Sequence, residues 1–379
     1  MAGLARLCIS GPRVRTVEPS KTARQGPDFW VKALTTRCFG GLLRSEAELI
    51  RASNAYATED ISKTWRLALT TMAVHGAAVG VVLLSDNIWA DILGSVVAGL
   101  VSIRAFIFYH DYCHGAIFRK SKAGKALMTL VGYYCMAVPS VWRETHNYHH
   151  RNNAKLVGSG IGSYPTVSLG IYRSLKESDR HKLKAIRHPA TVVLGIFTTF
   201  LIGMCYAPFR RDPKKHWQAP FSGVVWWAVL AGLGLAFGAR NAFFAMFLPT
   251  FIHSAMGSYL FYAQHNFPDA ELRGRRSWEF GHAALKASSF FDMAPIMHWF
   301  TGNIGYHHVH HLNSRIPFYR LPEAMREIPE LQNPGRTTWA LSDIKACFAC
   351  SVWDEASGRF LSFAEADAHV AGVMAEAAK

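Results

Sequence analysis

Histidines in this chain gather into three clusters whose spacing could bind metal. The clusters read HDYCH, HNYHH and HHVHH. Side chains three or four positions apart on a helix lie one above another, roughly 5–6 Å apart at Cβ, so each cluster can direct its imidazoles at one point. The chain has 18 histidines and a single one would mean little, but the same spacing occurs three times. We therefore expect eight metal ligands, namely His110, His114, His146, His149, His150, His307, His310 and His311.

The number of these histidines indicates how many ions they hold. A structural zinc ion takes four protein ligands and a catalytic one takes three. Eight or nine histidines would instead supply two ions with four or five ligands each. Imidazole binds iron, zinc, copper and nickel, so the ligand type alone does not name the metal. Two irons in such a cage can reduce dioxygen and attack an unactivated C–H bond, whereas zinc has no redox chemistry.

Long apolar segments must position the clusters. Four segments are each about long enough to cross a bilayer, which needs roughly 20 mostly apolar residues. Short polar stretches separate them within two pairs, with Arg240 and Asn241 at the second turn. We predict an all-α membrane protein with four transmembrane helices in two hairpins, at residues 66–85, 88–109, 221–239 and 242–263.

A fifth apolar segment, residues 190–207, decides the topology. It is followed by the basic residues Arg210, Arg211, Lys214 and Lys215. If the segment crossed the membrane, this basic loop would be translocated and the third histidine cluster would lie across the membrane from the first two, which the positive-inside tendency opposes. We therefore predict a re-entrant or interfacial helix, with all three clusters in a helical cap on the cytosolic face. A metal centre at that level lies where a lipid chain can reach it.

Composition and charge agree with a membrane protein that has a sizeable soluble part. Hydrophobic residues make up 50% of the chain and charged residues 18%. The formal net charge of +15 fits attraction to anionic lipid headgroups. We expect no nucleic-acid partner, because no stripe of Lys and Arg interleaved with aromatic residues is present. The seven scattered cysteines indicate no disulfide framework, and we expect Cys347 and Cys350 to be packing residues.

One integrated domain is expected, at residues 28–355. Residues 1–27 are basic and are predicted to form a flexible N-terminal tail, with an organellar transit peptide as the alternative. Residues 28–64 are predicted to form an amphipathic helix lying on the membrane. Residues 356–379 are predicted to form a C-terminal cytosolic tail.

The three clusters resemble the histidine boxes of the integral-membrane fatty acid desaturases. The segment GNIGYHHVHHLNSRIPFYRL is similar to the third-box region of the acyl-lipid, delta-12 (omega-6) type branch, and FYAQHNF resembles the element that ends the last span of that family. The resemblance covers about residues 60–355. In that family the boxes hold two irons on the cytosolic side, and a histidine outside the boxes adds a ligand. The resemblance therefore implies a ninth ligand, His265.

The resemblance also implies a reaction. A desaturase uses O2 and two electrons to put a cis double bond into a long acyl chain of a membrane lipid. No haem-binding HPGG element occurs in the sequence, so we expect a separate ferredoxin or cytochrome b5 to dock on a basic cytosolic surface. The expected location is a multi-pass position in a bacterial inner membrane, with the endoplasmic reticulum or an organelle as alternatives.

Other activities fit the same boxes. An acyl hydroxylase, an acetylenase or a carotenoid oxygenase would share the scaffold, because desaturation and hydroxylation diverge only after the first hydrogen abstraction. A non-catalytic metal transporter or sensor is the rival from another class. A transporter should place its ligands within the spans near the midplane, whereas these clusters lie at the ends of the predicted spans.

Polar neighbours of the clusters are candidates for orienting the imidazoles. Ligating histidines usually donate their other N–H to a carboxylate or carbonyl group. Asp111, Arg143 and Glu144 adjoin the first two clusters, and Asn266 and Asn303 are further candidates.

Three polar residues lie within apolar runs. Arg104 is expected to extend to the headgroups, and His75 and His253 are expected to be neutral packing residues with hydrogen bonds. Aromatic residues are candidates for lining a tunnel for the acyl chain, with interhelical packing as the alternative: Phe106, Phe108, Tyr109, Trp142, Phe261 and Tyr262.

Overall fold

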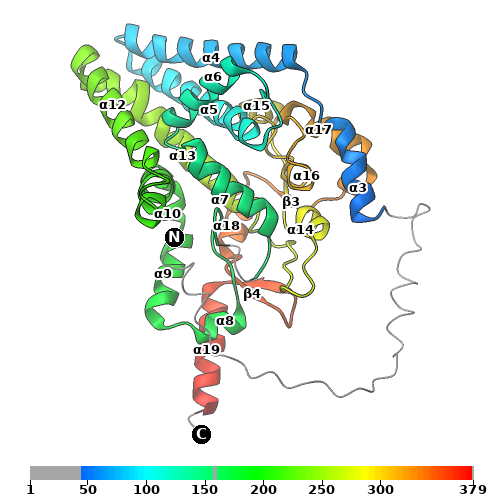
Figure 1. Ribbon diagram of the computed structural model, residues 1–379. Helices are drawn as coiled ribbons and strands as arrows, with labels where there is room; N and C mark the ends of the chain where they lie inside the picture. The colour runs from blue at the N-terminus through cyan, green and yellow to red at the C-terminus, as the bar shows by residue number, and fades with distance from the viewer. Residues whose placement is uncertain (1–43, 157–159, 378–379) are drawn as a thin grey trace.

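The long helices of this protein gather at one end of the molecule and shorter elements at the other (Figure 1). The computed structural model describes residues 44–156 and 160–377. Most of these residues are helical, as predicted, and the short strands among them are too small to form a second layer. The predicted tail at residues 1–27 lies outside the described residues.

The first two long helices are α4, Ile61–Leu84, and α5, Ile88–His114. Asp60 caps α4 by accepting a hydrogen bond from the Lys63 amide, and Asn87 caps α5 through the Trp89 amide. Helix α5 continues five residues beyond the predicted end of the span and so carries the whole first histidine cluster. It ends at Gly115, whose φ of 71° is left-handed and suits glycine.

A third membrane-length helical stretch covers Gln218–Ala263. It comprises α12, Gln218–Ala242, the short π-helix η3, Phe243–Phe247, and α13, Leu248–Ala263. Gly238 interrupts α12 with φ 86° and ψ 157°, which only glycine adopts readily. The predicted turn at Arg240 and Asn241 is therefore wrong by about two residues. By length and composition, α4, α5 and this stretch are the three candidate spans among the described residues.

An ion pair joins α12 to the start of α5, at the end of α5 that lies away from its histidines. The Arg240 guanidinium lies 2.5 Å from the Asp91 carboxylate, which is fully buried. Asp91 thus has a charged partner where its burial would otherwise be costly.

The fifth apolar segment folds as three short pieces, α10, Pro189–Val193, the π-helix η2, Ile196–Tyr206, and α11, Ala207–Arg211. Just before it, Arg187 donates to Asn266 beside His265. At its other end, Arg211 pairs with Glu144 near the second cluster. Both ends therefore lie at the level of the histidines.

Shorter helices form the cap around the ends of the long ones. Helix α7, Pro139–Asn152, carries the second cluster, and α16, His307–Leu312, carries the third. Helix α6, Lys122–Tyr134, instead packs against α5 and α12. The other short helices are α8, Leu169–Ser174; α9, Glu177–Arg187; α14, Phe280–Lys286; α15, Pro295–Phe300; η4, Phe318–Arg320; α17, Leu321–Glu327; η5, Pro329–Leu331; α18, Leu341–Ala349; and α19, Phe363–Ala377.

Five short strands tie the cap together within the described ranges. Strands β1, Val167–Ser168, and β4, Val352–Asp354, pair in parallel, and β5, Arg359–Leu361, pairs antiparallel with β4. Strands β2, Phe290–Phe291, and β3, Arg336–Thr337, form a second parallel pair. The predicted domain boundary at residue 355 falls in the turn between β4 and β5.

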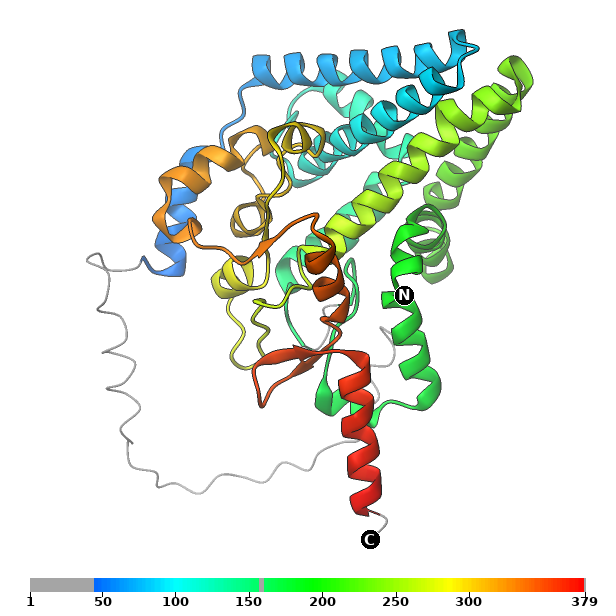
Figure 2. The same cartoon turned by 180° about the vertical axis from the view of Figure 1, so that it is seen from behind.

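The prediction of one amphipathic helix over residues 28–64 is wrong in its described part. That part contains α3, Glu46–Ser53, the 3-10 turn η1, Asn54–Tyr56, and non-helical residues before α4. Arg44 pairs with Glu330 at 2.6 Å, and Glu46 accepts from the Gly281 amide at 2.8 Å. These contacts hold α3 against the cap, beside α17 (Figures 1 and 2).

Candidate metal centre

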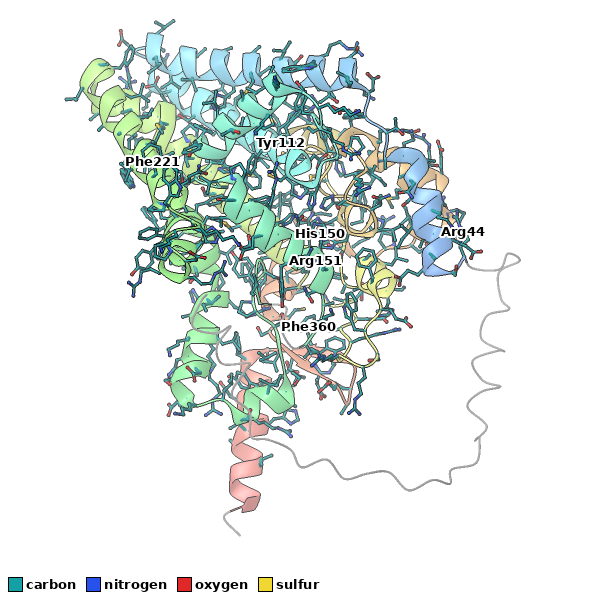
Figure 3. The ribbon with its side chains drawn as sticks, viewed as in Figure 1. Arg44, Tyr112, His150, Arg151, Phe221 and Phe360 are labelled. Atoms are coloured by element: carbon teal, nitrogen blue, oxygen red, sulfur yellow. The ribbon has the colours of Figure 1, made fainter. Side chains whose placement is uncertain are left out.

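The ring nitrogens of nine histidines converge in two neighbouring groups. The five-histidine group contains His110, His114, His146, His150 and His310, and the four-histidine group contains His149, His265, His307 and His311. Within each group the candidate ligand atoms all lie within 4.8 Å of one another. The structure therefore brings together all nine residues predicted from the sequence. Figure 3 shows His150 inside the molecule, between the long helices and the smaller elements.

Helices α7 and α16 each serve both groups. On α7, His146 and His150 are four residues apart and face the five-histidine group, whereas His149 points to the other. On α16, His310 joins the five-histidine group, and His307 and His311 join the four-histidine group. The rings of His150 and His311 stack across the boundary with centroids 4.1 Å apart.

Nitrogen–nitrogen distances within the groups are close to 3 Å. In the five-histidine group, Nε2 of His146 lies 2.8 Å from that of His110 and 3.1 Å from that of His150. In the four-histidine group, Nε2 of His265 lies 3.0 Å from that of His149 and 2.9 Å from that of His307.

These distances fit a shared metal ion better than hydrogen bonds. A neutral imidazole nitrogen carries either one N–H or one lone pair. Nε2 of His146 therefore cannot hydrogen-bond to both of its neighbours, and the same holds for His265. Two nitrogens that each lie about 2.1 Å from one metal ion, with an N–metal–N angle of about 90°, are about 3.0 Å apart. This is the spacing observed here.

Burial keeps the rings neutral. All nine histidines except the half-buried His114 are buried. Desolvation lowers the pKa of the α7 and α16 members of both groups well below the usual 6.5, with repulsion between neighbouring rings adding to it. Desolvation by burial also lowers the pKa of His265, to about 4. The neutral form carries the lone pair that a metal ion requires.

An apolar cavity of about 160 Å³ reaches the groups, and His110, His146 and His307 line it. Of the aromatic residues proposed for a tunnel, Phe106, Trp142 and Phe261 line this cavity. Phe108, Tyr109 and Tyr262 do not line it; they are core residues. Residues 160–164 also line the cavity and have no sequence signal that would have identified them.

The amino-acid sequence of this chain is similar to those of known proteins. A sequence model of the family described as fatty acid desaturase matches residues 87–341. The chain is 30% identical over 271 residues to a fatty acid desaturase of Bacillus subtilis (strain 168), covering 71% of this chain and 76% of that protein. The chain belongs to the fatty acid desaturase family. A probable fatty acid desaturase of Sorghum bicolor is 23% identical over 283 residues, or 72% of this chain and 69% of that protein.

As a fatty acid desaturase by family, the chain is an oxidoreductase, with a lipid substrate and membrane association implied. Its two histidine groups are compatible with a di-iron site. The matched residues 87–341 include all nine histidines.

A chain of hydrogen bonds fixes one ring of this desaturase. Nδ1 of His110 lies 3.0 Å from Oδ1 of Asp111, which confirms the predicted contact. Oδ2 of Asp111 accepts from the Phe318 amide at 2.7 Å, and Asn303 donates to the Phe318 carbonyl at 3.1 Å. Asn303 therefore acts on the site through two intermediates. His265 is fixed separately, by its Nδ1 donating to the Ala287 carbonyl at 3.0 Å.

Two predicted orienting residues point away from the site. Glu144 pairs with Arg211 at 2.8 Å and with Lys215 at 2.6 Å. The Arg143 guanidinium lies over the ring of Tyr112, 5.0 Å from its centroid. Both predictions are wrong, because adjacency in sequence does not place residues on the same helix face.

Arg187 is a buried residue that sequence reasoning missed. It donates to Asn266 Oδ1 at 2.8 Å, to the Pro165 carbonyl at 2.9 Å and to Tyr262 Oη at 3.1 Å. It also donates to the Cys350 carbonyl. Arg187 thus clamps the residue that follows His265 to two other segments. It ends the strongly charged helix ESDRHKLKAIR, where nothing in the sequence indicates burial.

The polar residues inside apolar runs differ in outcome. Arg104 does not extend to the headgroups; it is 4% exposed and donates to Thr71 and to the Trp299 carbonyl. His75 has the predicted hydrogen bond, at 3.2 Å to the Tyr134 hydroxyl. His253 is buried, but neither ring nitrogen has a partner among the described residues.

Proposed function

We propose that this chain is an O2-dependent acyl-lipid desaturase of delta-12 (omega-6) type, which introduces a cis double bond into a long acyl chain. The observation that carries the proposal is the meeting of two histidine groups with one apolar cavity. In this proposal the nine histidines hold two irons, through His110, His114, His146, His150 and His310 for one and His149, His265, His307 and His311 for the other.

The donor set supports iron. Neutral imidazoles suit several metals, but desaturation removes two electrons and two protons from the acyl chain, so the metal must be redox-active. Bound iron supplies the capacity to reduce dioxygen, which the side chains lack. The protein contributes the positions of the ligands: Nδ1 of His110 donates to the Asp111 carboxylate and Nδ1 of His265 donates to the Ala287 carbonyl, which holds each ring in one tautomer and orientation.

The cavity supports an acyl substrate. Its walls are mostly apolar side chains of α5, α7, η2 and α13, which exclude water from the reacting carbons. His110, His146 and His307 reach its surface, so a methylene pair lying in the cavity would be beside both groups. Trp142 stacks on His146 with ring centroids 4.7 Å apart, and the two rings together form part of the cavity wall.

The electron donor is proposed to be a separate ferredoxin or cytochrome b5. The net charge of +15 supports docking of an acidic partner. Membranes holding the iron-loaded protein are expected to form product only after a reduced donor is added.

We propose four spans, made by α4, α5, α12 and α13 with its preceding η3, and a cytosolic catalytic face. In a bacterial host, protease added outside the cell should remove a tag inserted after Asp86, between the first two spans. A tag after Lys214 should survive, because both ends of the segment from Pro189 to Arg211 lie at the level of the histidines. Cleavage at Lys214 from outside would contradict this topology.

The activity can be tested by the fatty acid profile of a host that lacks polyunsaturated chains. Expression of the intact protein should yield a new diene, located by mass spectrometry, that is absent with His149→Ala. Hydroxylated or acetylenic chains would instead assign a hydroxylase or an acetylenase. With iron bound and donor supplied, unchanged acyl chains would contradict the proposal and favour a non-acyl lipid such as a carotenoid.

A further inference from the structure

A half-buried tryptophan, Trp278, lies in the loop between α13 and α14. Its indole N–H donates to the Asn153 carbonyl at 2.8 Å. The Lys155 ammonium lies over its ring, 4.0 Å from the centroid. A buried indole N–H needs a partner and the face of the ring attracts a cation, so these two contacts hold the indole in one orientation.

Hydrogen bonds connect this indole with a ligand of the four-histidine group. Asn153 donates through Nδ2 to Oγ of Ser288 at 3.0 Å. Ser288 follows Ala287 in the chain, and the Ala287 carbonyl accepts from Nδ1 of His265 at 3.0 Å. Three hydrogen bonds and the covalent bonds between them therefore lead from a ring at the surface to His265.

The inner part of this route is shielded from water. Asn153, Ser288, Ala287 and His265 are all buried. Asn153 also follows His149, another ligand of the four-histidine group, by four residues. The route from Trp278 thus ends at the four-histidine group.

Basic side chains surround the outer end of the route. Lys155 and Arg273 are joined by a backbone bridge, which brings the end of α7 against the loop that contains Trp278. We define the Trp278 surface as this tryptophan with the five cations of the two segments: Arg151, Lys155, Arg273, Arg275 and Arg276.

The Trp278 surface keeps a net positive charge. Of its five cations, only Arg273 forms an ion pair among the described residues, with Glu279 at 3.1 Å. Two more acids, Glu271 and Glu355, lie in the same loop or beside it. Arg275 and Arg276 are exposed, so their charges are available to a partner.

This surface lies away from the long helices. The loop before α14 runs towards β4, whereas α4 lies at the opposite end of the molecule (Figure 2). A Cβ built at Gly274 of the loop would lie 3.6 Å from the carboxylate of Glu355, the residue after β4. Lipid headgroups at the ends of the long helices are therefore a poor match for this surface, and a soluble protein can reach it.

We propose that the Trp278 surface docks an acidic one-electron carrier protein, and that electrons enter through the Trp278 indole and reach the four-histidine group first. This inference rests on the proposed desaturase function. Opposite charge steers the carrier to the surface. Electron tunnelling falls off less steeply along bonded atoms than across gaps, so the hydrogen-bonded route favours this point over the rest of the surface.

The electrons balance with the proposed reaction. Two carrier molecules, each oxidised by one electron, supply two electrons. With two protons from water and one O2, these convert one CH2–CH2 unit of the acyl chain into a double bond and release two water molecules.

Docking is tested by binding of two probes, the soluble haem domain of a cytochrome b5 and a plant-type ferredoxin, to the full-length protein in detergent. Reversing two charges, with Arg275→Glu and Arg276→Glu together, should weaken binding about tenfold or more at low salt. The difference should shrink as salt rises, because exposed charges are screened.

Arg173→Glu with Lys176→Glu is the matched control for docking. Both residues are exposed, on α8 and just before α9, and neither forms an ion pair among the described residues. The control changes the net charge by the same amount as the first double variant, so it should keep wild-type affinity if position rather than total charge matters.

The route is tested by the rate at which the iron-loaded protein oxidises saturating reduced carrier, followed by stopped-flow absorbance. Trp278→Phe removes the indole N–H and keeps a ring under Lys155, whereas Trp278→Leu removes both. Trp278→Leu should slow the oxidation by an order of magnitude and Trp278→Phe by less, with carrier affinity close to wild type in both. Trp217→Leu, at an exposed tryptophan just before α12, should keep the wild-type rate.

The outcomes separate this inference from the proposed function. Wild-type affinity in the Arg275 and Arg276 double variant overturns the docking surface, and a wild-type rate in Trp278→Leu overturns the route. Should Trp278→Leu fail to fold, Trp278→Phe decides: slower oxidation at unchanged affinity supports the route, and a wild-type rate overturns it. The proposed function fails on another result, a wild-type protein that oxidises the carrier with acyl lipid and O2 present yet forms no unsaturated chain.

Discussion

His310→Ala and His265→Ala should each lower desaturase activity more than about a hundredfold, because loss of even an outer-shell partner of a metal ligand commonly costs 10- to 100-fold. The two residues belong to different groups, the first to the five-histidine group and the second to the four-histidine group. Removing either leaves one ion short of a ligand in a buried site. Activity should be measured together with iron per chain, which should fall below the wild-type value in both variants.

His308→Gln is the control from the same helix. His308 is as buried as its neighbours, but it belongs to neither group, and its Nε2 contacts the Leu331 carbonyl at 3.0 Å. A glutamine amide can donate to the same carbonyl, so iron content and activity should be close to wild type. Full activity of His310→Ala with normal iron would remove His310 from the ligand set.

Arg187→Met should be the most destabilising substitution outside the histidine groups. It removes the donor for several buried acceptors, among them Asn266 Oδ1 and the carbonyl groups of Pro165 and Cys350. An unpaired buried acceptor costs about 1–3 kcal/mol, so the loss should reach about 3 kcal/mol or more. The measurement is thermal unfolding of the detergent-solubilised protein.

Two further variants show whether the geometry of Arg187 matters. Arg187→Lys keeps the charge but cannot reach several acceptors at once, so its unfolding midpoint should lie between those of wild type and Arg187→Met. Arg173→Met removes an exposed arginine on α8 whose side chain, among the described residues, donates to His369 alone, and it should change stability by less than about 0.5 kcal/mol. An Arg187→Met protein as stable as Arg173→Met would show that the clamp is dispensable.

The sequence predicts the histidine site well because helical spacing is local. Clusters with spacings of three and four residues must share a helix face, and long apolar segments must be buried or lie in lipid. The division into groups could not be predicted in this way. His149 and His150 are neighbours in sequence, yet they serve different groups, because the outcome depends on how α5, α7, α13 and α16 pack.

The missed features depend on contacts between distant segments. Arg187 is buried because three separate segments supply its acceptors, at Pro165, at the end of α13 and at Cys350, and none of them adjoins it in sequence. The sequence predicts Glu144 beside the histidines, but Glu144 pairs instead with Arg211 at the end of α11 and with Lys215 just after it. The polar residues Arg240 and Asn241 predict the chain reversal two residues too late, because the backbone conformation at the reversal requires a glycine, which is Gly238.

The sharing of α7 and α16 between the two histidine groups constrains how such a centre can change in evolution. A mutation that rotates or shifts either helix displaces ligands of both proposed irons together, so neither ion can be adjusted on its own. Drift in one half of the centre must be compensated in the other. The two metal positions are therefore inherited as one unit. The cavity walls on α13 and η2 do not carry ligands of both groups, so they are free to diversify.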